Sequence, residues 1–272
     1  MYSISIDEIN SFDKTELKSK WAELLKISLI GKESAISRFI NDEDKGFLHS
    51  FKVYKKALEC VHGIAQTDDV HLDYDAIEQL SVFHDIGKFF QDLPTWENLK
   101  ISQDLYREFS KAQNVTNSTT TKVFEGIPAT DFYCRRLEPS GTSPQSLEAE
   151  IVRVSDKMQD NLVPKVDRYW FEYGVPRNAT FFDPSLTFAD REKFSFENFC
   201  GDQMNLILTI ISLRPQDISH PLLGRMYEEW STPMKDQVVN RILALASELG
   251  ESSENICQIQ ALIIDYRDRY SC

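Results

Sequence analysis

Histidine and aspartate side chains in the middle of the chain have the types and spacing of metal ligands. The stretch Phe83-His84-Asp85-Ile86-Gly87-Lys88 puts an imidazole next to a carboxylate. Ile77, Leu80 and His84 lie on one face of a predicted helix, so the imidazole should face the core. Two such groups buried without partners would each cost about 2 kcal/mol or more. A shared divalent metal would remove that cost, and a histidine hydrogen-bonded within the core is the alternative.

Two other segments could complete such a site. His49 lies in the first turn of an amphipathic helical pattern, and 35 positions separate it from His84. That interval allows a helix, a loop and a second helix running back, which would bring both imidazoles together. Asp156 lies in a helix predicted over 147–162, and Asp160 follows one turn later on the same face. Alone, such an aspartate is usually solvated, but beside the other candidates Asp156 becomes the natural fourth ligand.

The order H…HD…D resembles the HD superfamily of metal-dependent phosphohydrolases. The resemblance covers residues 47–162 and rests on three motifs in order, which are Leu48-His49-Ser50-Phe51-Lys52-Val53, the His84-Asp85 stretch, and Leu147-Glu148-Ala149-Glu150-Ile151-Val152-Arg153-Val154-Ser155-Asp156-Lys157-Met158. It implies an all-α fold with an HD-type helical bundle at its core and additional C-terminal helices.

The resemblance also implies a ligand set and a chemistry. One divalent ion would be held by His49, His84, Asp85 and Asp156. Mixed nitrogen and oxygen ligands tolerate Mn²⁺, Mg²⁺, Fe²⁺, Co²⁺, Ni²⁺ or Zn²⁺. The ion would activate a water and polarise a phosphoryl oxygen, with Asp85, Lys88 and Asp160 as the catalytic residues. Lys88 would steady the substrate phosphate or, alternatively, pair with a neighbouring aspartate. Asp160 would orient the water or a histidine, unless it lies on a solvated face.

One departure from the superfamily pattern favours a mononuclear site. Binuclear members carry further histidines between the HD pair and the last aspartate, and this chain has none there. It reads Tyr133-Cys134-Arg135-Arg136 instead. Arg135 and Arg136 could bind a substrate phosphate with their forked donors, or be ordinary surface charges.

These residues lead to three functional hypotheses. The first is a phosphohydrolase that cleaves a phosphoester of a small molecule, with a nucleotide as the preferred substrate. The second is a non-catalytic or slow ligand-sensing module, suggested by the missing central histidines. The third is a nuclease acting on single-stranded nucleic acid. The net charge of −13 argues against it, and against duplex nucleic acid as a partner, because such proteins normally present a basic surface.

Composition also bears on compartment. The five cysteines are scattered, odd in number and without a CxxC pair, which is typical of reduced thiols. The N-terminus lacks the basic and apolar regions of a secretory signal. The longest apolar stretch, 204–213, has about half the length of a membrane span. We therefore expect a cytoplasmic protein with no membrane partner.

The apolar patterns in the rest of the chain predict further helices. We expect residues 1–165 to form the metal-binding domain. The metal-bearing helix should end near residue 93, because Pro94 disfavours helix before it. The polar run 114–121 is expected to be a loop, followed by a helix over 129–137. Residues 166–272 should form an aromatic-rich loop to about residue 200 and a helical extension packed on the same core. That extension is either an appendage or the interface of a homodimer.

Overall fold

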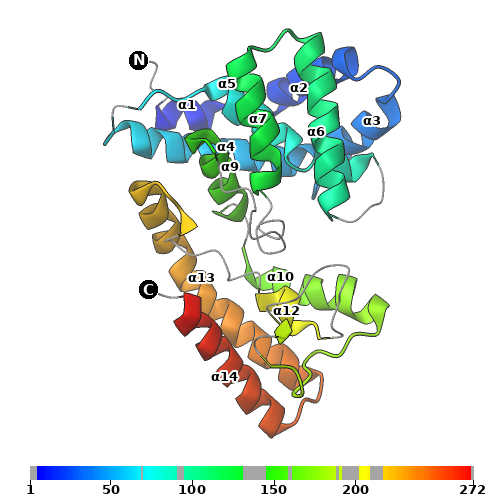
Figure 1. Ribbon diagram of the computed structural model, residues 1–272, viewed down its shortest axis with the longest axis vertical. Coiled ribbons are helices and arrows are strands. Elements are labelled where there is room, and N and C mark those ends of the chain that lie inside the picture. Colours follow the sequence, from blue (N-terminus) through cyan, green and yellow to red (C-terminus); the bar gives the residue numbers. More distant parts are fainter. Residues whose placement is uncertain are drawn as a thin grey trace. The chain divides into compact units, whose positions relative to one another are not determined.

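The protein is almost entirely helical in the part of the chain that the structure, a computed structural model, describes (Figure 1). It describes residues 5–68, 70–90, 95–130, 145–158, 161–187, 190–191, 202–208 and 217–270. Within these ranges the only β pairing is an isolated parallel bridge between Thr180 and Asp202. The all-α prediction is therefore confirmed. The described helices also include none long and apolar enough to cross a bilayer.

The chain divides into two compact units, residues 1–159 and 160–272. The predicted boundary at residue 165 lies six residues further along. The second unit has a hydrophobic cluster made of its own residues, including Trp170, Ile242 and Ile263. Packing of this extension on the core of the first unit stays a prediction.

Three helices open the first unit: α1 (Ile6–Ser11), α2 (Lys14–Ser28) and α3 (Glu33–Asn41). Ser5 and Glu8 form a reciprocal capping box at α1, and the Asp13 side chain caps α2 by accepting from two backbone N–H groups. These side chains replace hydrogen bonds that the first helical turn cannot make. The helix starts are thus fixed locally by sequence.

Four helices form the centre of the first unit. They are α4 (Phe47–Ala65), α5 (Tyr74–Phe83), α7 (Asn117–Thr130) and α9 (Leu147–Met158). α9 packs against each of the other three, so even its polar residues from Glu148 to Ser155 are buried. α6 (Thr95–Ala112) packs against α7 and against the 3₁₀ helix η1 (Ile86–Phe89). This arrangement places the start of α4, the end of α5 and the end of α9 in one neighbourhood.

Two boundaries in this unit differ from the prediction. α5 ends at Phe83 and η1 at Phe89, so the metal-bearing segment is not one helix continuing to about residue 93. α7 begins at Asn117, so the polar run 114–121 is not all loop. The Thr116 hydroxyl accepts from the backbone N–H of Thr119 at 3.2 Å and starts the helix. The helix predicted over 129–137 lies largely outside the described residues.

The second unit contains α10 (Val163–Arg168), the π-helix η2 (Tyr169–Gly174), the 3₁₀ helix η3 (Val175–Arg177) and α12 (Met204–Leu208). It also contains α13 (Pro221–Glu248) and α14 (Ser253–Tyr270), which pack side by side (Figure 1). The prediction of a loop from residue 166 is wrong as far as residue 177, where the backbone is helical. Trp170 and Val166 in this stretch are buried in the unit's own cluster, which stabilises the helical turns.

Candidate metal centre

His84 lies immediately after α5 and is held in one orientation by the backbone. Ile77 and Leu80 on the same helix face are buried, and only 2% of His84 is exposed. Its Nδ1 lies 2.9 Å from the carbonyl oxygen of Ser81. A carbonyl oxygen only accepts, so Nδ1 carries the proton and the neutral ring has its lone pair on Nε2. Nε2 is therefore the atom able to bind a metal.

His49 meets His84 as the interval between them predicted. It lies in the first turn of α4, which packs against α5, and its Nε2 is 3.1 Å from Nε2 of His84. The start of α4 is fixed by Gly46, where an added Cβ would lie 2.1 Å from the carbonyl oxygen of Phe39. The close approach of α3 to Gly46 thereby sets where the His49 imidazole stands.

Both predicted carboxylates approach the two imidazoles. Asp156 comes from the last turn of α9, and its Oδ1 lies 3.4 Å from Nε2 of His49 and 3.8 Å from Nε2 of His84. Asp85 is the residue before η1, and its Oδ2 lies 3.7 Å and 3.9 Å from the same nitrogens. Three helical segments and the turn before η1 therefore bring all four predicted ligands to one place.

The separations suit a shared cation. Metal–nitrogen and metal–oxygen bonds of about 2.1 Å put two neighbouring ligand atoms about 3.0–3.4 Å apart and two opposite ones about 4.2 Å apart. His49, His84 and Asp156 each offer one ligand atom within 4.8 Å of the others, so this group could hold a metal ion. Asp85 is not part of that group, but its Oδ2 lies within 3.9 Å of both imidazole Nε2 atoms.

The electrostatics favour the protonation states that a metal requires. Burial lowers the pKa of His84, which favours the neutral imidazole. Burial alone would raise the pKa of Asp85, but the nearby positive charge, above all the Lys88 ammonium, outweighs it and holds the pKa below its usual range. The same opposition, with Lys157 as the main counter-charge, holds the pKa of Asp156 well below its ordinary value. Both carboxylates are thus ionised at neutral pH.

Two lysines flank the cluster. The ammonium of Lys88 bonds Oδ2 of Asp85, so the predicted pairing of this lysine with a neighbouring aspartate is observed. The ammonium of Lys157 bonds Oδ2 of Asp156, while Oδ1 of that carboxylate faces the histidines. The side chains of Asp85 and Asp156 are 21% and 15% exposed, so solvent and a small anion can reach this edge.

The remaining predicted site residues, Asp160, Arg135 and Arg136, lie outside the described residues, and their roles stay predictions. Sequence reasoning missed two contributors. Lys157 follows Asp156 directly in the third motif, and a cation beside a predicted ligand was the available signal. The backbone of Ser81, one helical turn before His84, left no signal in residue type.

Comparison of the chain with protein-family models, with curated proteins and with solved structures finds no match. The resemblance to the HD superfamily therefore stays a prediction from the three sequence motifs.

Proposed function

We propose that this protein is a metal-dependent phosphohydrolase of the HD type. It would hydrolyse a phosphoester of a small molecule, and a nucleotide is our preferred substrate. The observation that carries the proposal is the convergence of His49, His84, Asp85 and Asp156 from three segments distant in sequence, with both Nε2 atoms near the carboxylates.

The donor set fits one divalent cation. Two imidazole nitrogens and two ionised carboxylates match the mixed ligation that Mn²⁺, Fe²⁺, Co²⁺, Ni²⁺ or Zn²⁺ accept, and Mg²⁺ is possible with additional waters. A bound ion would supply a water of lowered pKa and a Lewis acid for a phosphoryl oxygen.

The chain's own residues then have separate tasks. The Ser81 carbonyl keeps the Nδ1 proton of His84 in place, so its lone pair stays directed into the site. Lys88 and Lys157 put two ammonium groups at the open edge of the cluster, where they would attract the substrate phosphate. A negatively charged phosphate monoester or nucleotide should bind at this edge better than an uncharged ester.

Metal binding is the first test, by elemental analysis and by titration calorimetry of chelator-treated protein. Metal at 100 times its Kd should stabilise the first unit by about 2.7 kcal/mol, a rise in Tm on the order of 5–10 °C. Asp156→Ala and Asp85→Ala should lose most of this rise. Asp104→Ala removes an exposed carboxylate of α6 and should keep it. An unaltered protein that binds none of the six metals would contradict the proposal.

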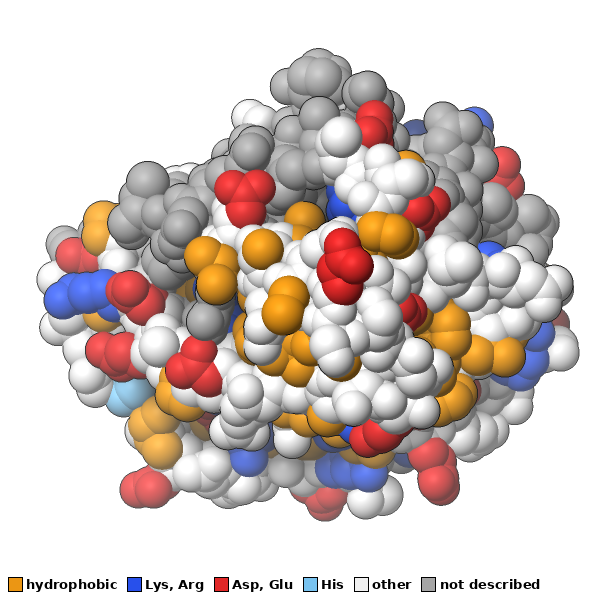
Figure 2. Space-filling model, turned by 90° about the horizontal axis from the view of Figure 1, so that it is seen from below, with side chains coloured by type: hydrophobic (Ala, Val, Ile, Leu, Met, Phe, Trp, Pro, Cys, Tyr) orange, Lys and Arg blue, Asp and Glu red, His pale blue; other side chains and the backbone are white. Residues whose placement is uncertain are grey.

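Turnover is the second test. The metal-loaded protein is offered nucleoside mono-, di- and triphosphates, generic phosphoesters and single-stranded oligonucleotides. We expect release of phosphate or nucleoside from a nucleotide, lost in His84→Ala. Tight binding of a nucleotide without turnover would support the ligand-sensing alternative, and cleavage of oligonucleotides alone would support the nuclease. On the one face shown in Figure 2, acidic, basic and apolar side chains are intermixed among the coloured residues.

A further inference from the structure

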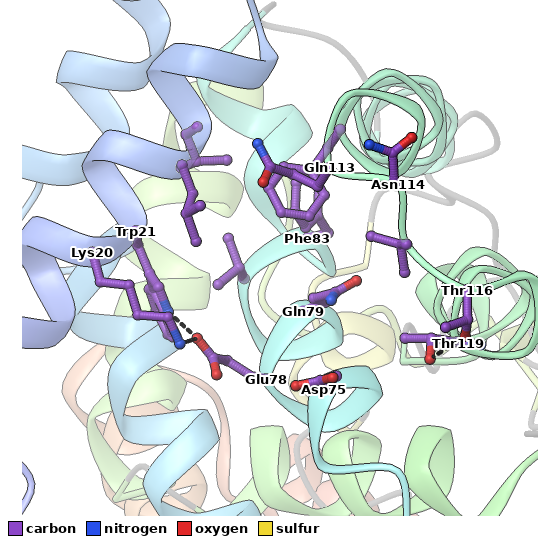
Figure 3. A pocket seen from close by; sticks show the side chains of 15 residues that line it. Lys20, Trp21, Asp75, Glu78, Gln79, Phe83, Gln113, Asn114, Thr116 and Thr119 are labelled. Carbon is purple, nitrogen blue, oxygen red and sulfur yellow. Dashed lines mark hydrogen bonds and ion pairs between the residues drawn. The ribbon is translucent and has the colours of Figure 1, made fainter.

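The first unit contains a cavity of about 360 Å³ that shares no residue with the metal centre. It lies between α2, α5, the end of α6 and the segment that leads into α7 (Figure 3). Its volume falls in the range of pockets that bind small organic molecules. All the residues around it belong to residues 1–159, so the cavity is complete within one unit.

One side of the cavity is lined mainly by apolar residues. Trp21, Phe83 and Phe109 are aromatic lining residues, and Leu24 and Val82 are aliphatic ones. The three aromatic residues are buried in the first unit's core, so this side is rigid. A ligand with a flat apolar body would remove apolar area of this lining from water.

The lining also includes two amide side chains, each held by a hydrogen bond at one of its two polar atoms (Figure 3). The Tyr106 hydroxyl donates to Oε1 of Gln79 at 2.8 Å, which directs the amide nitrogen of Gln79 away as a remaining donor. The amide nitrogen of Gln113 donates to Ser28 at 2.8 Å, which leaves Oε1 of Gln113 as an acceptor. A ligand with both a ring nitrogen and an N–H group would satisfy this pair.

The charges around the cavity disfavour an anion. Glu78 accepts from the Lys20 ammonium at 2.6 Å and from the Trp21 indole at 2.8 Å, so the lysine is already engaged. Asp75 adds a second carboxylate at the exposed rim. The lining thus has an excess of negative charge, in contrast to the lysine-flanked edge of the metal centre. A phosphate would be repelled here.

We propose that this cavity is a second ligand site, which binds a planar, phosphate-free heteroaromatic molecule that is uncharged or cationic. Its size fits one or two fused rings with a small substituent. The site shares α5 with the metal centre, since Gln79, Val82 and Phe83 line the cavity just before His84. The proposal does not depend on hydrolysis, because none of its residues is a predicted metal ligand.

Binding to the chelator-treated protein tests the proposal. The probes are purine and pyrimidine bases, their nucleosides, their 5′-monophosphates and aminoquinolines, followed by saturation-transfer NMR and calorimetry. We expect at least one base, nucleoside or aminoquinoline to bind with a Kd below about 1 mM. Its phosphorylated counterpart, where one exists, should bind at least tenfold more weakly. Failure of every phosphate-free probe, or equal binding of the monophosphates, would overturn the proposal.

Variants locate the bound probe. Val115→Trp fills the cavity from the segment between α6 and α7, where Val115 is half-buried, and should abolish binding. Asp75→Asn should weaken the binding of a cationic probe several-fold. Glu23→Gln makes the same charge change at an exposed position outside the cavity and should leave the binding unchanged. Asp156→Ala should leave binding intact even if it destroys the metal centre. Unchanged binding in a folded Val115→Trp protein would contradict the assignment.

Discussion

The two lysines at the metal centre make unlike contributions to the electrostatics of their carboxylates. Lys88 bonds the same Asp85 oxygen that faces the histidines, whereas Lys157 bonds the Asp156 oxygen turned away from them. If the proposed function is right, the phosphate of a substrate could draw the Lys157 ammonium away with less disturbance of the Asp156 oxygen that faces the histidines. This difference predicts distinct kinetic effects.

Replacing Lys157 by Met should spare metal binding and raise KM for the phosphorylated substrate about tenfold, equal to about 1.4 kcal/mol of lost binding. Lys88→Met should lower kcat as well, because Asp85 loses the ammonium that holds its ligand oxygen. The checks are steady-state kinetics and metal titration. Lys52→Met, at an exposed position of α4, is the control for charge. Unchanged kinetics in both site variants would remove the lysines from the reaction.

Cysteine reactivity gives a second prediction at this scale. Cys60 is buried in α4, where burial raises the pKa of its thiol to about 11. At pH 8 almost none of it is thiolate, the reactive form. Iodoacetamide should modify exposed Cys257 within minutes and leave Cys60 unmodified until the protein unfolds, as followed by peptide mass spectrometry. Equal labelling of both cysteines in folded protein would show that α4 opens readily.

How much of the candidate site could be predicted from the sequence depends on what kind of group is involved. Histidine and aspartate can be recognised as possible metal ligands from residue type alone. His49, His84, Asp85 and Asp156 could therefore be grouped from their spacing, from helix periodicity and from the resemblance to the HD superfamily. A backbone contact such as that from Ser81 has no residue type, and a lysine next to a ligand is too common to single out. Those contributions become visible only when coordinates fix the directions.

At the scale of elements, the short helix η1 positions Asp85 and Lys88 by lying very close to α6. An added Cβ on Gly87 would be 2.0 Å from the carbonyl oxygen of Asn98, and the Gly87 N–H donates to Ser102 at 2.9 Å. Only glycine allows this approach. The segment after α5 therefore turns against α6 instead of continuing as a helix, which periodicity could not reveal.

Gly87→Ala should consequently displace η1. We expect a loss of about 2–3 kcal/mol in the free energy of unfolding and a metal affinity reduced by tenfold or more, because Asp85 moves with the turn. Urea denaturation and metal calorimetry measure the two effects. Ser102→Ala keeps the space but removes the acceptor, so it should cost about 1–3 kcal/mol with a smaller effect on metal. Wild-type metal affinity in Gly87→Ala would contradict the role given to η1.

The helices themselves were largely predictable because their apolar periodicity reflects burial. The exceptions have local causes. Thr119 and Val123 are buried on α7, yet the polar composition of the run 114–121 hid that helix. α13 contains Pro233 in its interior and still continues as one helix of 28 residues. Proline costs one backbone hydrogen bond, and packing of the helix on both sides of it can offset that loss.

At the scale of the whole molecule, the two units are stabilised by separate means. The second unit contains a buried ion pair at 2.5 Å between Arg191, which is 6% exposed, and Asp202, which is fully buried. Asp202 also accepts from the backbone N–H groups of Asp183 and Met204. This carboxylate thus holds together Asp183, Arg191 and Met204 within the second unit.

Asp202→Asn should therefore destabilise the second unit by about 3–5 kcal/mol, because the Arg191 charge stays buried without its partner. Hydrogen exchange with mass spectrometry should show faster exchange in peptides of 161–187 and 217–270. Metal binding by the first unit should persist. Glu248→Gln removes a carboxylate from the largely exposed pair with Arg241 and should leave exchange nearly unchanged. If Asp202→Asn and Glu248→Gln increased hydrogen exchange equally, burial of the Asp202 carboxylate would not explain the effect of its loss.

The contact between His84 and the carbonyl of Ser81 has one more consequence. Its acceptor belongs to the peptide chain, so every amino acid at position 81 that maintains the helix supplies it equally. Substitution of Ser81 should therefore leave the orientation of the His84 imidazole unchanged. The substitutions that position 81 accepts would be limited by the volume around its fully buried side chain.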